Sequence, residues 1–197
     1  MNKNMEPGNL DEEIRKKLSG WKRTRSNRIS ASERFKKYDS RWGIITLFMN
    51  TLAIIMVLWT LKFPLKSGID GILSGGFSIY VILLQDLLGK RDYSARSLKL
   101  HYEQLEIESL RYRLKGIYGN KYMDQRKKQQ IYNNIVNEYQ ASLRGNENHN
   151  KIDDRLYNEK EDGKSQIKKD VTLDNAFIYI NCIIFGISLI SFYMINK

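Results

Sequence analysis

The stretch from Trp42 to Leu61 reads WGIITLFMNTLAIIMVLWTL and contains no ionisable side chain. A helix of this length rises about 30 Å, which matches the thickness of the hydrocarbon core of a bilayer. Trp42 and Trp59 lie near its two ends, and tryptophan side chains favour the membrane–water interface. Residues 42–61 therefore predict a first transmembrane helix.

Two other apolar blocks predict further spans. Residues 176–195, AFIYINCIIFGISLISFYMI, again lack ionisable side chains. Residues 68–88 are less uniform, because Asp70 and Asp86 lie near the two ends, where each can reach water or a neighbouring cation. A soluble hairpin over 42–88 is the alternative, but a soluble helix is rarely apolar around its whole circumference. The fold class expected is all-α, an integral membrane protein with three transmembrane helices.

The distribution of charge predicts how these spans are oriented. The net charge is +11, and residues 1–41 carry twelve Lys or Arg against six Asp or Glu. Three explanations are open: nucleic-acid binding, attraction to anionic lipid, and membrane topology. Cations flank the spans at 1–41 and 89–175 but are sparse in the link 62–67. The positive-inside rule then places the N-terminus and residues 89–175 in the cytoplasm and the C-terminus outside. Direct nucleic-acid binding is not expected.

Residues 1–41 form a basic region that precedes the first span. Ala31, Phe35 and Tyr38 recur at helical spacing among basic side chains. This pattern predicts an amphipathic helix lying on the membrane surface. An earlier helical segment is expected to end at Gly20, because glycine weakens a helix.

Residues 89–175 are expected to form a cytoplasmic helical hairpin and a polar linker. The first helix, 97–117, carries two apolar rows, which predicts packing on both sides by the same chain or by another subunit. The first row, our candidate for an oligomer contact, contains Leu100, Ile107, Leu110 and Leu114. The second row contains Leu98, Tyr102, Leu105 and Tyr112. A second helix is expected over 121–143, and residues 145–169 show little periodicity.

No pattern of side chains predicts catalysis, a cofactor or a metal. The single cysteine, Cys182, excludes an internal disulfide, and His101 and His149 lack the spacing of metal ligands. Acidic residues within 103–108 are expected to pair with Arg111 and Arg113 on the same helix. We therefore do not expect an enzyme.

Small and polar residues inside the spans are the candidate functional residues. Gly71 and Gly75 form a GxxxG pair, extended by Ser78, which allows another helix to approach closely, although such pairs also occur by chance. Asn50 and Asn181 carry amides within apolar runs.

These amides can bond within the chain or line a polar seam between subunits. A carboxylate at Asp86 can face a cavity near the cytoplasmic side. These six residues are the candidates for a helix interface or a pore lining.

Three segments together resemble a known family. They are TRSNRISASERFKKYDSRWGIITLFMNTLAII (24–55), RDYSARSLKLHYEQLEIESLRYRL (91–114) and YQASLRGNENHNKIDDRLYN (139–158). The chain resembles the SLATT proteins, bacterial membrane effectors associated with nucleotide-signalling and SLOG systems, from about residue 10 to its end. It looks most similar to the branch encoded beside reverse transcriptases.

The resemblance implies an oligomeric effector of abortive infection in the bacterial inner membrane, which forms a pore or disrupts the membrane. A partner encoded nearby, such as a reverse transcriptase or a nucleotide-signalling enzyme, would trigger it. The commonest family form has two spans, so the third span is an elaboration. The alternative function is a membrane-tethered module that recruits a cytoplasmic partner without forming a pore.

Overall fold

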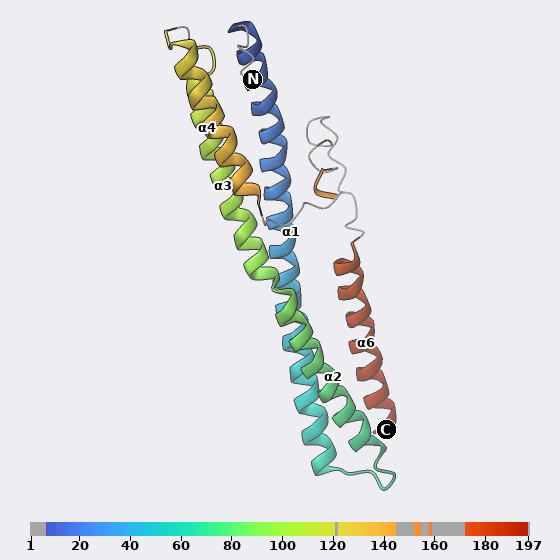
Figure 1. Ribbon diagram of the computed structural model, residues 1–197. Coiled ribbons are helices and arrows are strands. Elements are labelled where there is room, and N and C mark those ends of the chain that lie inside the picture. Colours follow the sequence, from blue (N-terminus) through green and yellow to red (C-terminus); the bar gives the residue numbers. More distant parts are fainter. Residues whose placement is uncertain (1–6, 121, 145–151, 155–157, 159–171, 197) are drawn as a thin grey trace. The chain divides into compact units, whose positions relative to one another are not determined.

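A computed structural model describes residues 7–120, 122–144, 152–154, 158 and 172–196. Regular structure in these residues is helical, with no strand, which confirms the all-α fold class. The main helices, in chain order, are α1 (Pro7–Lys62), α2 (Ile69–Arg91), α3 (Tyr93–Ile117), α4 (Gln125–Leu143) and α6 (Leu173–Ile195) (Figure 1).

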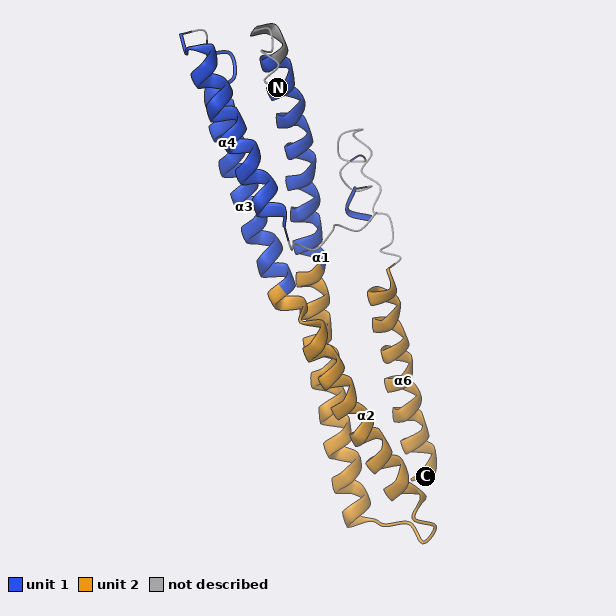
Figure 2. Cartoon of the chain, in the orientation of Figure 1, with its two compact units in different colours: residues 1–34, 96–167 blue, residues 35–95, 168–197 orange. Residues whose placement is uncertain are grey.

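The chain divides into two compact units (Figure 2). Unit 1 comprises the described parts of residues 1–34 and 96–167, and unit 2 those of residues 35–95 and 168–197. Helix α1 is continuous and contributes to both units. Each unit is described by itself below.

Helix α1 runs through Gly20 without interruption, so the expected break at Gly20 is wrong. One glycine inside a helix costs only about 0.5–1 kcal/mol relative to alanine. The next residue, Trp21, is buried and stacks on Tyr139 of α4, with ring centroids 4.1 Å apart. Packing of this kind stabilises the helix by more than the glycine weakens it.

The core of unit 1 is built from three helices. Apolar side chains of α1, α3 and α4 form one buried cluster, so the expected hairpin of two helices also packs against α1. The cluster contains Leu10, Ile14, Trp21, Ile107, Leu110, Leu114, Ile117, Tyr132 and Ile135. The first apolar row of α3 thus faces this chain's own core.

The second row of α3 lies on the surface of unit 1. Leu98, Tyr102, Leu105 and Tyr112 are all exposed, with 46% of Leu105 accessible. The two predicted rows therefore differ in their surroundings, because α3 is covered on one side only within the described residues of this unit.

Unit 2 contains the apolar parts of α1 and α2 together with α6. The link before α2 turns at Gly68, whose φ of 66° favours glycine, and the carboxylate of Asp70 accepts a hydrogen bond from the backbone N–H of Leu65 at 3.1 Å. Asp70 is 1% exposed. We expected Asp70 to reach water or a nearby cation. Instead, its hydrogen bond with the backbone of Leu65 stabilises the link between α1 and α2.

Many large apolar side chains of unit 2 are exposed, among them Leu47, Phe48, Ile72, Ile82 and Ile183. Among the described residues, three helical stretches are long and apolar enough to cross a membrane. They lie within Leu10–Lys62, Ile69–Ile117 and Leu173–Ile195. Apolar surface of this extent is stable only in lipid, so the chain is a membrane protein. The limits of each span stay predictions.

Truncating one residue in each row of α3 tests which row is buried. We expect Leu114→Ala to destabilise unit 1 by about 2–5 kcal/mol, because it leaves a cavity in the core. Leu105→Ala, the matched control on the exposed row, should change stability by less than about 1 kcal/mol. Thermal unfolding of the full chain in detergent, followed by circular dichroism, measures both. Equal effects would contradict the packing described here.

Candidate functional site

A buried polar contact joins α2 and α6 inside the apolar part of unit 2. The hydroxyl of Tyr80 donates a hydrogen bond to Oδ1 of Asn181 at 2.6 Å, and Nδ2 of Asn181 donates to the carbonyl oxygen of Phe177 at 2.8 Å. Asn181 is 0% exposed. Its amide is therefore satisfied within the chain, both by its own helix and by a neighbour. The sequence pointed to Asn181 but not to Tyr80, because a tyrosine in an apolar run also suits simple packing.

Asn50 is in the opposite situation. It lies in the middle of the apolar run of α1 and is half-buried. Within the described part of the chain its side chain makes no hydrogen bond. An amide in hydrocarbon without a partner costs free energy, so Asn50 requires water or a group outside the described residues.

The GxxxG pair makes no close helix contact within unit 2. A Cβ atom added at Gly75 would meet nothing within 4 Å, and one at Gly71 would lie 3.9 Å from Cγ2 of Thr60. Ser78 donates to the carbonyl oxygen of Ser74 at 2.8 Å, along its own helix. Gly75 therefore has open space beside it, whereas Gly71 lies at contact distance from α1. The role of this small face in packing against another helix stays a prediction.

Asp86 forms an ion pair with Lys90, with 2.6 Å between Oδ2 and Nζ. Both side chains are exposed. The expectation that Asp86 reaches a basic neighbour is confirmed, whereas its place beside a cavity stays a prediction.

Polar contacts also hold the start of α6 within unit 2. The carboxylate of Asp174 accepts hydrogen bonds from Arg91 and, at 2.7 Å, from the hydroxyl of Tyr93. Nη1 of Arg41 donates to Oδ1 of Asn175 at 3.0 Å. Asp174 lies in the first turn of α6, where the helix dipole favours a negative charge. These contacts attach the third span to the helices of the other two.

Two aspartates in the expected polar linker are bound tightly to α1 in unit 1. Asp153 is 0% exposed and accepts two hydrogen bonds from Arg34, at 3.2 Å from Nε and 2.9 Å from Nη2. Asp154 accepts from Nε of Arg23 at 2.7 Å and from Nδ2 of Asn27 at 3.0 Å. Such paired contacts fix both position and orientation. We call these five residues the aspartate clamp.

The aspartate clamp gives part of the linker a fixed position and gives several basic residues of α1 a partner within the chain. We expected residues 145–169 to be polar and without regular structure. Residues 152–154 are instead partly or fully buried, while most of the segment, including His149, lies outside the described residues. Several arginines of α1 bind acids of this chain. The basic excess therefore does not serve only lipid contact and topology.

The expected pairing within α3 is wrong. Glu103 forms an ion pair with Arg28 of α1 at 3.2 Å, and Glu108 pairs with Arg25 at 2.7 Å. Arg113 pairs with Glu138 of α4, and this contact lowers the pKa of the Glu138 carboxyl. Contacts between helices replace contacts along the helix, because α1 and α4 bring opposite charges next to α3.

One tyrosine of unit 1 is also tied to an acid. The hydroxyl of Tyr132 donates to Oε1 of Glu13 at 2.6 Å. Burial, and then this hydrogen bond, raise the pKa of Tyr132, so the hydroxyl keeps its proton and remains a donor. Among the described residues, no group of three or more His, Cys, Asp or Glu could hold a metal ion.

The candidate oligomer residues belong to unit 1, whereas the candidate span residues belong to unit 2. Leu100, Ile107, Leu110 and Leu114 are all buried in unit 1. A contact between subunits along α3 would therefore use the exposed second row. That this helix mediates oligomerisation stays a prediction.

Asp153→Asn tests the aspartate clamp. The substitution removes the carboxylate charge that pairs with the buried Arg34 guanidinium, so we expect a loss of about 3–5 kcal/mol for the attachment of residues 152–154. Hydrogen–deuterium exchange over these residues should rise strongly. Asp86→Asn, which changes an exposed pair, is the control and should leave exchange there unchanged. Unaltered protection in Asp153→Asn would contradict the clamp.

Tyr80→Phe tests the contact between α2 and α6. Removing the hydroxyl leaves Oδ1 of Asn181 without this donor, and we expect a loss of about 0.5–2 kcal/mol. A double-mutant cycle with Asn181→Leu, measured by thermal unfolding in detergent, isolates the pair. Tyr179→Phe, an exposed tyrosine of α6, is the control. A coupling energy of zero would show that the two side chains do not interact.

Comparison with known proteins places the chain in a family. Residues 10–195 match the family model described as SMODS and SLOG-associating 2TM effector domain family 5. Among curated proteins and among solved structures there is no match. The family description has two transmembrane segments, whereas this chain has three candidate spans. The match does not distinguish the branch beside reverse transcriptases. The chain belongs to the SLATT family of membrane effectors of defence systems.

Proposed function

We propose that this protein acts as an oligomer that permeabilises the bacterial inner membrane during phage infection. Membership of the SLATT family supports a role as a membrane effector of a defence system. The pore, the oligomer and the trigger extend this role and are our proposal.

The observation that supports the pore is Asn50, whose side chain has no hydrogen-bond partner among the described residues although it lies within an apolar run. A lipid-facing amide is costly, whereas an amide at a subunit contact or beside water is satisfied. The open space beside Gly75 supplies a surface for a neighbouring helix. A single subunit of three spans cannot enclose a conducting path, so the proposal requires several copies around an axis.

The trigger acts on unit 1 in this proposal. A partner, such as a reverse transcriptase or a nucleotide-signalling enzyme, or its product, shifts unit 1 between two packings. The aspartate clamp lies on the part of α1 that belongs to unit 1, and Asn50 lies on the part of the same helix that belongs to unit 2. A change in the contacts between α1 and the two aspartates of the clamp can therefore alter the part of α1 that carries Asn50. The N-terminus lies in the cytoplasm and the C-terminus outside, and no catalytic step is involved.

A second candidate function is a membrane tether that recruits a cytoplasmic partner. The exposed second row of α3 favours it, because an apolar row on a helix is a common docking surface. In that case the spans serve only as anchors.

Asn50→Leu distinguishes the two functions. We expect it to abolish membrane depolarisation after triggering, at unchanged protein level in the membrane, because leucine cannot bond across a subunit contact or line a water path. Fluorescence of a potential-sensitive dye in expressing bacteria is the measurement.

Thr51→Val is the matched control, since among the described residues the hydroxyl of Thr51 bonds only to the carbonyl oxygen of Leu47 in its own helix, at 2.9 Å. Depolarisation should persist in this variant. If Asn50→Leu depolarises cells as the wild type does, the amide has no part in a pore. If the triggered wild type never depolarises cells, the tether is the better function.

A further inference from the structure

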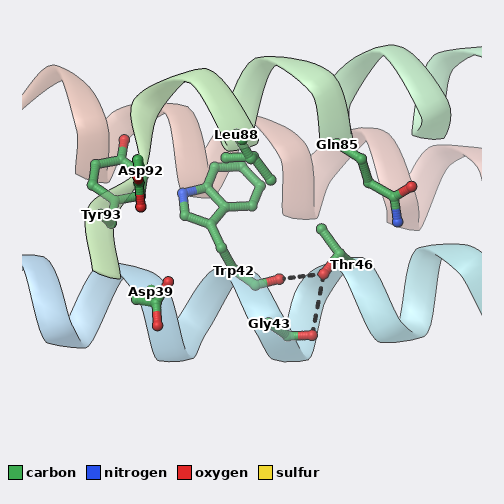
Figure 3. Close-up of a pocket in the computed structure, with 9 residues that line it drawn as sticks. Asp39, Trp42, Gly43, Thr46, Gln85, Leu88, Asp92 and Tyr93 are labelled. Carbon is green, nitrogen blue, oxygen red and sulfur yellow. Dashed lines mark hydrogen bonds between the residues drawn. The ribbon is translucent and has the colours of Figure 1, made fainter. Parts of the chain in front are cut away.

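A pocket opens in unit 2 between α1 and the end of α2 (Figure 3). Its volume is about 360 Å³, within the range of small-ligand sites. Gly43 of α1 and Gly89 of α2 line the pocket and have no side chain that would fill it. The residues used in the argument below are Asp39, Trp42, Gly43, Gln85, Gly89 and Asp92.

Two carboxylates lie at one end of this pocket. Asp39 is exposed and, within the described part of the chain, has neither an ion pair nor a hydrogen bond. Asp92 accepts one hydrogen bond at Oδ1, from the backbone N–H of Ala95 at 3.1 Å. Its second oxygen makes no contact of this kind within the described residues. Figure 3 places both carboxylates at the same end. Two such charges attract a cation with N–H donors.

A buried donor lies beside the carboxylates. Trp42 is 3% exposed, and its indole Nε1 has no acceptor among the described residues. The nitrogen faces the end of the pocket where Asp39 and Asp92 lie (Figure 3). Buried donors are nearly always satisfied, so an acceptor is expected from a molecule in the pocket. The site therefore suits a ligand with an ammonium group next to an oxygen acceptor.

The position of the pocket along the helices identifies the source of this ligand. Trp42 is the first residue of the apolar run of α1, and Leu88 ends the apolar run of α2. Exposed apolar side chains follow on one side, including Ile44, Leu47 and Leu87, and exposed Lys36 and Lys37 precede on the other. Phospholipid headgroups lie at this level of a membrane protein.

We propose that the pocket binds the headgroup of phosphatidylethanolamine. Its primary ammonium lies between the carboxylates of Asp39 and Asp92, and an oxygen of its phosphate accepts from Trp42. Phosphatidylcholine has the same charges but no N–H donor, and phosphatidylglycerol has no cation, so neither satisfies the carboxylates. This inference concerns lipid recognition and does not depend on pore formation.

Native mass spectrometry of the full chain tests the proposal. The protein is released from nanodiscs that contain equal amounts of phosphatidylethanolamine, phosphatidylcholine and phosphatidylglycerol. We expect the wild type to retain phosphatidylethanolamine over the other two by about tenfold, as expected for one charge-assisted hydrogen bond. Asp39→Asn should remove most of this preference. Trp42→Phe should instead lower the retention of all three lipids, because each of them carries the phosphate that accepts from the indole. Asp39 is exposed, so its variant should fold normally.

Two matched controls lie outside the pocket. Asp86→Asn removes an exposed carboxylate of α2 that already pairs with Lys90. Trp59→Phe removes an indole donor that already bonds to Oδ1 of Asn196 at 3.1 Å. Both should keep the lipid retention and the preference of the wild type. The proposal is overturned if the wild type retains phosphatidylcholine equally, if Asp39→Asn keeps the preference, or if the controls lose it to the same extent.

Discussion

The continuity of α1 is the constraint on which both units depend. Its N-terminal turns supply Leu10, Ile14 and Trp21 to the core of unit 1, and its apolar run supplies the first candidate span of unit 2. A helix that passes Gly20 unbroken keeps its faces in register, so each turn presents a defined side to its neighbours. The basic residues of α1 are placed in the same way, and several meet acids of α3 or of residues 152–154.

Satisfaction of buried polar groups distinguishes structural residues from candidates for function. The side chains of the aspartate clamp, and those of Tyr80 and Asn181, bind one another within the chain, and each set joins segments distant in sequence. The amide of Asn50 and the indole N–H of Trp42 have no hydrogen-bond partner among the described residues. Groups of the first kind stabilise the fold, whereas groups of the second kind are the candidates for contact with another molecule.

The third candidate span is attached by polar contacts as well as by apolar packing. Asp174 and Asn175 at the start of α6 bind side chains of the other helices of unit 2. The family description has two spans, yet its match extends through residue 195 and so includes this helix. An anchor held only by lipid would need none of these contacts. We therefore regard α6 as an integral part of unit 2.

An all-α membrane protein can be predicted from the amino-acid sequence alone, because runs such as 42–61 exclude charge over the length of a bilayer. The two apolar rows of α3 can also be predicted, since periodicity is local. Which row is buried, and which partner each charge binds, depends on the packing of distant segments and is seen in the fold alone. Asp153 is the clearest case: nothing adjacent in sequence shows that it meets Arg34, because partners of buried charges are set by how distant helices pack, not by spacing along one helix.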